Sequence, residues 1–405
     1  MVVGATLLAL AGVFNPVSMT GPDALRVNPA QLAFVERPGF SCRFLDLDLS
    51  AGNNAFSFAQ YNRYTGAFLD QKSKDDILGS IPGAGLGIAG SASASGVEFG
   101  FGNFAASVRT VGQGELSLPK DLFDLALYGN QLGRVYELVE PKARAQALLR
   151  AGAGVGSAFG EHFAVGVAAY YLRGLAYADV SEARGYFVTT ETALAGEGLV
   201  AYRKASGGSG YSFDAGCAWW DKSWRVSLAV LDLGPGVTWV DGLEQGEFRF
   251  VLDSANAYQL KTEDRLSYGF ETGAAAPFTS VQPWRGRLGI SNDPLRWLST
   301  GLSIECGVDP ELFELEHWQA GLVAEFRPLT WLPLAAEVEY DSEDKWCLGA
   351  DAGLALGRFQ MLARFGFMSG VWDRAKGVTL GLGIGYCRAY QHTEPEHFRI
   401  QYGVN

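Results

Sequence analysis

Large apolar residues alternate with small or charged residues along the last third of the chain. In the segment 318–327, Trp318 and Phe326 lie on one face of an extended backbone and Glu325 lies on the other. A repeat of two residues is the period of a β-strand, because successive side chains point to opposite sides of a sheet. The pattern therefore predicts strands with one apolar and one polar face. The same period recurs at 284–291, 334–340 and 358–367.

The predicted strands are about ten residues long, which is the length that a tilted strand needs to cross a bilayer. Strands of soluble sandwiches are usually five or six residues long. All 10 Trp lie from Trp219 onward, several near predicted strand ends, as in the aromatic girdles of membrane barrels, although a buried role for some remains an alternative. We therefore expect an all-β fold, a transmembrane antiparallel β-barrel with its apolar face toward lipid.

Earlier segments are rich in glycine and less sharply patterned, but they also predict strands. Together with eight candidates after residue 280 they give about 14 strands and at most 16, an even number being usual for such barrels. Helical patterns interrupt the strands at 73–81 and 118–139, and the polar stretch 241–264 predicts a long extracellular loop. A last alternating strand is expected at 397–405. The earlier candidates are 40–50, 84–94, 97–109, 148–158, 163–175, 211–219 and 224–232.

Composition and charge narrow the possible functions. Of 405 residues, 52 are Gly and 19% are charged, and the formal net charge is -12, which argues against a nucleic-acid partner. The 5 Cys form no C-x-x-C pair. The 4 His include His392 and His397, beside two glutamates in the last turn, where a metal site is conceivable but a solvated hairpin is the simpler interpretation. We expect no cofactor, no metal and no enzymatic activity, since no Ser, His and acid arrangement is recognisable.

The N-terminus predicts export. Residues 2–14 form an apolar stretch of signal-peptide length with a small-residue cleavage site, although a basic start is missing. No run of 18 apolar residues occurs, so no membrane-spanning helix is expected. We assign residues 1–11 to a signal peptide, and its missing basic start would follow if the start codon had been assigned too late.

The segment 21–33, GPDALRVNPAQLA, resembles the N-terminal segment of the FadL-type fatty-acid transporters and of related secretion-accessory barrels. Asn28, Pro29 and Ala30 carry the match. Physically, Pro29 fixes its own φ and favours an extended Asn28, whose side chain can bond the local backbone, so a plain turn is the alternative. The resemblance implies that residues 12–39 form a hatch inside a single barrel of residues 40–405.

A longer resemblance runs from residue 28 to about 160. It includes the segments 53–58, 102–105, 118–122 and 128–130, which follow the Asn-Pro-Ala motif in this order. The order resembles an uncharacterised family of outer-membrane barrels, a domain of unknown function. This resemblance implies the cell outer membrane and a barrel fold, and it implies no activity.

The polar faces of the predicted strands are the most functional-looking feature. If the apolar faces meet lipid, charged side chains of both signs point into the lumen. Neighbouring strands lie about 4.8 Å apart, so opposite charges on them can form ion pairs. Mixed signs favour a lumen filled by ion pairs; the alternative is a polar path or binding surface for a solute. The lumen-facing candidates are Arg285, Arg287, Glu305, Glu325, Arg327, Glu337, Glu339, Arg358 and Arg364.

We interpret the chain as an outer-membrane barrel that binds or transports a small hydrophobic molecule, as the transporter resemblance implies. The alternative is a non-transporting structural or secretion-accessory barrel. A soluble β protein is a third, disfavoured possibility. The expected partners are outer-membrane lipid and a small hydrophobic ligand, and protein partners stay open.

Overall fold

The computed structural model describes residues 14–34, 37–138, 142–256, 265–295, 297–308, 315–329, 331–342 and 345–389. The predicted signal peptide and last strand, together with His392 and His397, lie outside these ranges. No helix in the described part of the chain is long and apolar enough to cross a membrane.

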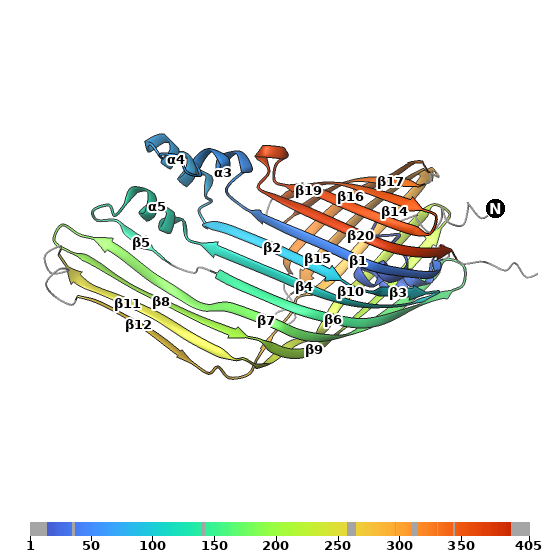
Figure 1. Ribbon diagram of the computed structural model, residues 1–405, viewed down its shortest axis with the longest axis horizontal. Helices are drawn as coiled ribbons and strands as arrows, with labels where there is room; N and C mark the ends of the chain where they lie inside the picture. Colours follow the sequence, from blue (N-terminus) through green and yellow to red (C-terminus); the bar gives the residue numbers. More distant parts are fainter. Residues whose placement is uncertain are drawn as a thin grey trace, which may run out of the picture.

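Fourteen antiparallel strand positions form a closed ring, which confirms the predicted barrel (Figure 1). The ring closes because β1 (Pro38–Asn53) pairs with β20 (Gly377–Ala389). Two positions are each shared by two collinear strands, β2 (Leu86–Ser95) with β3 (Glu98–Phe101), and β13 (Phe278–Ser280) with β14 (Trp284–Leu295). The other positions are β4 (Phe104–Leu118), β6 (Lys142–Phe159), β7 (Phe163–Thr189), β9 (Gly207–Asp221), β10 (Trp224–Asp241), β15 (Leu298–Val308), β16 (Leu315–Leu329), β17 (Leu332–Asp341), β18 (Trp346–Leu356) and β19 (Phe359–Met368).

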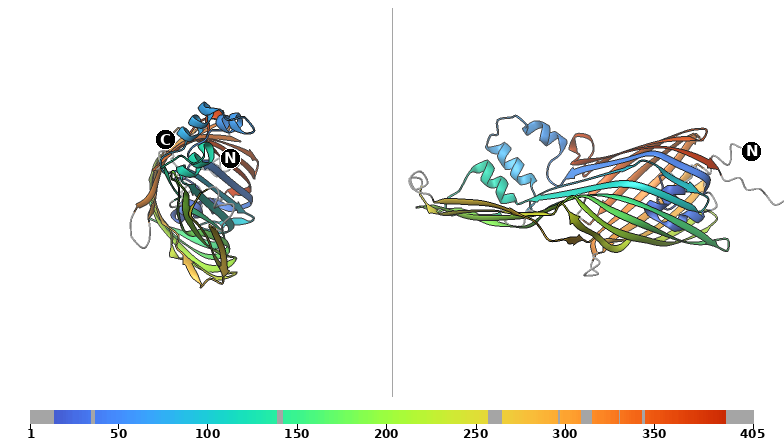
Figure 2. Two further views of the ribbon diagram at one scale, coloured as in Figure 1. Left: turned by 90° about the vertical axis from the view of Figure 1, so that its left-hand side faces the viewer. Right: turned by 60° about the horizontal axis from the view of Figure 1, so that its bottom comes forward.

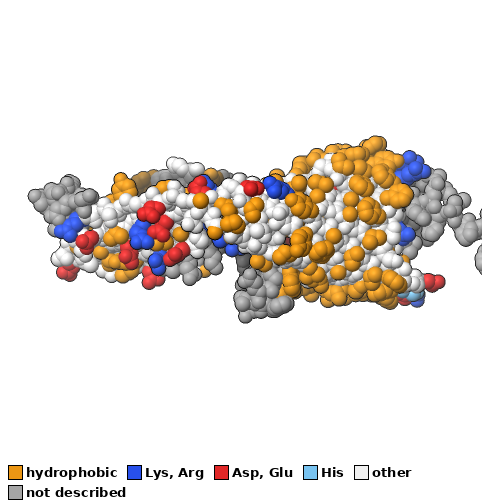
Figure 3. Space-filling view, turned by 90° about the horizontal axis from the view of Figure 1, so that it is seen from below, with side chains coloured by type: hydrophobic (Ala, Val, Ile, Leu, Met, Phe, Trp, Pro, Cys, Tyr) orange, Lys and Arg blue, Asp and Glu red, His pale blue; other side chains and the backbone are white. Residues whose placement is uncertain are grey.

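The outer face of the ring is apolar and the inner face is not. Leu322 on β16 is 59% exposed and Leu382 on β20 is 58% exposed, and an orange band of such side chains covers the barrel (Figure 3). At the end of the barrel with short turns, four exposed tryptophans lie at or beside strand ends, as an interfacial girdle requires. They are Trp219, Trp224, Trp297 and Trp331. Trp239, in contrast, is fully buried, so this tryptophan has a core role and is not part of a girdle.

The opposite end of the barrel carries helices, α3 (Phe58–Tyr64), α4 (Gln71–Ser80) and α5 (Lys120–Tyr128), and the one-turn η3 (Trp372–Arg374) (Figure 2). Asp70 caps α4 by accepting from the Ser73 N–H, which explains why this helix begins slightly earlier than predicted. The predicted helix 118–139 ends at Gly129, which has a φ of 73°. The chain then forms the short strand β5 (Val135–Glu137).

A sheet projects beyond the barrel at this same end (Figures 1 and 2). It consists of β5, the distal half of β7, β8 (Leu194–Ala205), β11 (Glu244–Ala255) and β12 (Leu266–Gly273). The prediction of a loop at 241–264 is therefore wrong for Glu244–Ala255, which forms the strand β11. Its residues looked polar because one of the sheet faces is charged, with Glu247 and Arg249 on adjacent positions of that face.

Candidate functional site

The N-terminal segment lies inside the ring of strands (Figures 1 and 2). Three short helical turns form it, η1 (Gly21–Asp23), α2 (Ala24–Val27) and η2 (Pro29–Ala33). Every residue of η2 is buried. We call residues 14–34 the hatch.

Asn28 ties the hatch to two strands of the wall. It is fully buried, and its amide nitrogen donates to the carbonyl oxygens of Cys217 at 3.0 Å and Leu228 at 3.1 Å and to the Ser227 hydroxyl at 2.9 Å. Its amide oxygen accepts from the Ala30 N–H at 2.9 Å. Asn28 has the extended backbone that a residue before proline favours. The Asn-Pro-Ala motif therefore caps a helical turn and anchors it to β9 and β10.

Glycines on the inner wall allow the hatch backbone to approach closely. A Cβ atom on Gly166 would lie 2.3 Å from the Ala30 nitrogen, and one on Gly216 would lie 2.1 Å from the Asn28 amide oxygen. Real Cβ atoms do not approach that closely, so a side chain at either position would displace the hatch. Contacts to the hatch under 3.0 Å would also occur at Gly154, Gly156, Gly289 and Gly301.

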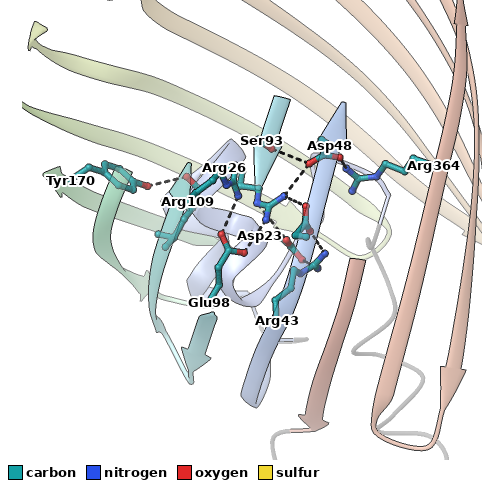
Figure 4. Close-up of polar contacts among 11 residues, drawn as sticks. Asp23, Arg26, Arg43, Asp48, Ser93, Glu98, Arg109, Tyr170 and Arg364 are labelled. Atoms are coloured by element: carbon teal, nitrogen blue, oxygen red, sulfur yellow. Dashed lines mark hydrogen bonds and ion pairs between the residues drawn. The ribbon is translucent and has the colours of Figure 1, made fainter. Parts of the chain in front are cut away.

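Arg26 of the hatch joins four carboxylates (Figure 4). Its guanidinium lies 2.9 Å from Asp46 and 3.7 Å from Asp48 on β1, 2.8 Å from Glu98 on β3, and 3.8 Å from Asp23 of the hatch itself. Glu98 is fully buried. Further ion pairs extend this cluster through Arg43, Arg109 and Arg364.

A second cluster lies on the wall strands β6 to β15. Arg150 lies 3.0 Å from Asp214 and also pairs with Asp232, and Arg285 lies 2.7 Å from Asp232 and 3.3 Å from Glu305. Because Asp232 receives two guanidinium groups, it links three wall strands. The cluster reaches the hatch through Tyr170, which stacks 3.7 Å below Arg150 and donates its hydroxyl to the Leu25 carbonyl at 3.0 Å.

The two clusters contain as many arginines as carboxylates. Such matched pairing suits burial, because an isolated charge in a dry interior is very costly. The arginines are Arg26, Arg43, Arg109, Arg150, Arg285, Arg287 and Arg364, and the carboxylates are Asp23, Asp46, Asp48, Glu98, Asp214, Asp232 and Glu305.

The charged residues singled out from the sequence fall into four groups. Arg285, Arg287, Glu305 and Arg364 belong to the two clusters. Glu325 and Arg327 form a separate pair at 2.9 Å, and Glu325 also accepts from the Phe14 backbone N–H at the start of the hatch.

Glu337 and Glu339 lie on the inner face of β17, where their side chains pass over wall glycines. The Glu337 Cγ would be 2.4 Å from a Cβ on Gly349, and the Glu339 Cγ would be 3.5 Å from one on Gly321. Within the described ranges, neither carboxylate has a cation within 4 Å. This part of the lumen wall therefore has excess negative charge.

The prediction that Arg358 points into the lumen is wrong. It lies in the turn between β18 and β19, is exposed, and donates to the hydroxyl of Tyr386 at 3.2 Å. The alternation that suggested an inward side chain begins at Phe359, so Arg358 lies outside the repeating strand.

The hydrogen-bond ladder of the wall is interrupted on β10. Pairing of β10 with β14 ends at Leu231 and Arg285, and pairing resumes with β13 at Val237 and Ser280. Between these points Asp232 and Gly236 adopt φ values of 61° and 90°, and the β9 pairing shifts register. A β-bulge bends a strand in this way. The residues at the interruption include the apolar Leu233, Pro235, Val281 and Pro283, together with the polar Asp232 and Gln282.

No arrangement suited to a metal ion occurs among the His, Cys, Asp and Glu side chains that the structure describes. The arrangement can instead hold a plug in place and bend the wall beside it.

Comparisons with known proteins agree with this architecture. Residues 43–203 match the model of a family described as a family of unknown function (DUF5723), which confirms the longer resemblance noted from the sequence. No curated protein matches the sequence.

Among solved structures, the chain is similar to two toluene transporters and a FadL homologue. The Ralstonia pickettii toluene transporter TbuX is 13% identical, with a TM-score of 0.50 over 93% of this chain and 98% of that one. The P. putida toluene transporter TodX is 10% identical, with a TM-score of 0.51 over 92% and 94%. A Pseudomonas aeruginosa FadL homologue is 11% identical, with a TM-score of 0.53 over 90% and 94%. The chain therefore has the fold of the FadL-type barrels, and its N-terminal half resembles a family of unknown function.

Proposed function

We propose that this protein is an outer-membrane barrel that takes up or binds a small hydrophobic molecule, with residues 14–34 as the hatch that closes its lumen. The observation that carries the proposal is the hatch itself, a buried segment held by a motif and by wall glycines. The similar proteins that are toluene transporters by name support the same substrate class.

The interruption of the wall on β10 supplies an exit in this proposal. A strand ladder seals a barrel wall because every backbone group pairs with a neighbour. At 232–236 the pairing with β13 and β14 is absent, and Leu233, Pro235, Val281 and Pro283 are among the bordering residues. The ion pair from Arg285 to Asp232 lies directly at the inner side of the interruption. A hydrophobic molecule would leave sideways here, toward lipid.

The second candidate is a non-transporting barrel that supports other surface machinery. The observation that favours it is the projecting sheet, which extends well beyond the apolar band and plays no part in closing the lumen (Figures 1 and 3).

A reversible covalent lock on the hatch distinguishes the two candidates. A Cβ on Gly289 would lie 3.6 Å from the Cβ of Val17, which is within the range for a disulfide. The double variant Val17→Cys, Gly289→Cys should therefore join the hatch to β14 under oxidising conditions. The measurement is uptake of radiolabelled toluene by intact cells that carry the protein in their outer membrane.

We expect the oxidised double variant to lose uptake and the reduced one to regain it. The single variant Val17→Cys and the reduced double variant serve as controls, because neither contains the bond, whereas Gly289→Cys alone would meet the Val17 side chain at 2.6 Å. If cells carrying the unmodified protein take up no more toluene than cells without it, transport of this class of molecule is rejected. If the oxidised lock leaves uptake unchanged, the hatch does not gate the path.

A further inference from the structure

The strand β12 forms an unguarded edge of the projecting sheet. Within the described part of the chain it pairs with β11 alone, and all eight of its residues are exposed. Tyr268 is 76% exposed and Phe270 is 62% exposed. Proteins usually protect an edge with lysine, proline, a bulge or a very short strand. β12 contains no lysine and no proline, and its ladder with β11 runs from Leu266 to Gly273 without a bulge.

The backbone groups at the free edge can be assigned from one hydrogen bond. The Asp253 N–H donates to the Arg265 carbonyl oxygen at 3.1 Å, so these two opposite residues form a hydrogen-bonded pair. Hydrogen-bonded and non-hydrogen-bonded pairs alternate along an antiparallel ladder. The odd-numbered residues of β12 therefore bond β11. The N–H and C=O groups that point away from the sheet belong to Leu266, Tyr268, Phe270 and Thr272.

The sequence of β12 is complementary to itself in the opposite direction. A twofold axis through Gly269 places Tyr268 opposite Phe270 of a second copy, and Leu266 opposite Thr272. All four are residues with outward backbone groups, as hydrogen-bonded pairs require, and each pair exchanges two bonds. Aromatic cross-strand pairs stabilise such a ladder. Glu271, the one charged residue of the strand, faces Ser267, so no carboxylate meets another.

We propose that β12 pairs antiparallel with β12 of a second copy of this chain. β12 runs from the tip of the projecting sheet back toward the barrel (Figure 1). An antiparallel pair on a twofold axis then places the two barrels at opposite ends of one continuous sheet. In detergent the protein forms an end-to-end dimer. In membranes, where the placement rests on the proposed function, the pair connects two facing bilayers.

The register is tested with cysteines in the full-length protein. Gly269 faces itself across the axis in a non-hydrogen-bonded pair, with Cα atoms about 4.5 Å apart, which suits a disulfide. A Cβ on Gly269 meets no atom within 4 Å, so Gly269→Cys should fold. We expect oxidised Gly269→Cys to yield a covalent dimer. The matched control is Ser267→Cys on the same face, because its two copies would lie about four residues apart along the ladder.

Backbone pairing is tested at Phe270. Phe270→Pro removes one outward N–H from each copy and leaves the bonds to β11 intact, whereas Phe270→Ala removes the ring and keeps the N–H. In sedimentation in detergent, we expect Phe270→Pro to raise the dimer Kd by about tenfold or more, and Phe270→Ala to have a smaller effect. Lipid vesicles containing the unmodified protein should cluster, and vesicles containing Phe270→Pro should not.

Three results would overturn the proposal. One is an unmodified protein that stays monomeric at all concentrations, which would leave the edge to a strand of a different protein. Another is equal cross-linking of Gly269→Cys and Ser267→Cys. The last is a dimer whose Kd is unchanged by Phe270→Pro. None of these experiments depends on toluene uptake, so the pairing can fail while the transport proposal stands, and the reverse also holds.

Discussion

Arg26 of the hatch and Glu98 of the barrel wall form an ion pair at 2.8 Å in which the carboxylate is fully buried. They are far apart in sequence, so this contact exists only when the hatch is seated. Arg109 binds the second oxygen of Glu98 at 3.1 Å. Arg26 also pairs with Asp46 on β1, so these ion pairs link the seating of the hatch to the packing of β1, β3 and β4.

Replacing Arg26 with Met should unseat the hatch. The substitution leaves Glu98 and Asp46 with less compensating charge in a dry site, and breaking a buried pair in this way costs about 3–5 kcal/mol. Urea unfolding followed by tryptophan fluorescence measures the change. Arg184→Gln, which removes an exposed pair with Glu182 on the projecting sheet, is the control and should change the free energy of unfolding by about 1 kcal/mol or less. Equal effects of the two substitutions would contradict the role of Arg26.

Gly166→Ala should disturb the hatch without disturbing the barrel. The new methyl would lie 2.3 Å from the Ala30 nitrogen, and overpacking of this kind costs about 1–3 kcal/mol. Gly286→Ala on the outer face of β14 is the control, since a Cβ there meets no atom within 4 Å. Amide hydrogen exchange of residues 24–33 should increase in Gly166→Ala and stay unchanged in Gly286→Ala. Unchanged exchange in both would show that the hatch tolerates the extra methyl.

The barrel could be predicted from the sequence because each strand repeats the same signal. Alternation places Leu322 outward and Glu325 inward whatever the neighbouring strands do. The projecting sheet was missed because both of its faces are accessible, so segments such as Glu244–Ala255 lack the sharp apolar face that marks a membrane strand.

The hatch clusters were harder to predict. Arg285 and Glu305 lie on strands adjacent in sequence, and their pairing follows from alternation. Asp46 and Glu98 also lie on neighbouring strands, but a bulge in β1 turns Asp46 inward, and their shared partner Arg26 comes from the hatch; neither feature is evident from the local sequence pattern. The inward glycines gave a signal that could have been used, because several recur at inward positions of neighbouring strands. Only the structure shows that these glycines make room for the backbone of the hatch.

The contact between α4 and α5 should depend on pH. The Tyr128 hydroxyl donates to Asp75, and this bond raises the pKa of Tyr128 to about 12. Because the folded pKa lies above the ordinary value of 10.0, the stabilising bond is fully present below pH 10 and is lost as the pH rises through 12. The absorbance at 295 nm of the unmodified protein minus that of Tyr128→Phe isolates this titration. Asp75→Asn should return it toward pH 10, and a difference curve already centred there would contradict the assignment.

Asn28→Asp tests whether the hatch motif acts through its hydrogen-bond donors. An aspartate has nearly the same shape, but in place of the amide nitrogen it presents a carboxylate oxygen to the carbonyl oxygens of Cys217 and Leu228, so two attractive contacts become repulsive. Leaving such groups buried without a donor costs about 1–3 kcal/mol each. Asn28→Ala loses the same bonds without the added charge, so we expect Asn28→Asp to be the more destabilising of the two. Asn130→Asp, at an exposed bond to Thr189, is the control and should have little effect on unfolding. If Asn28→Asp were milder than Asn28→Ala, the motif would act mainly by filling space, and its Asn would be replaceable by any residue of similar volume.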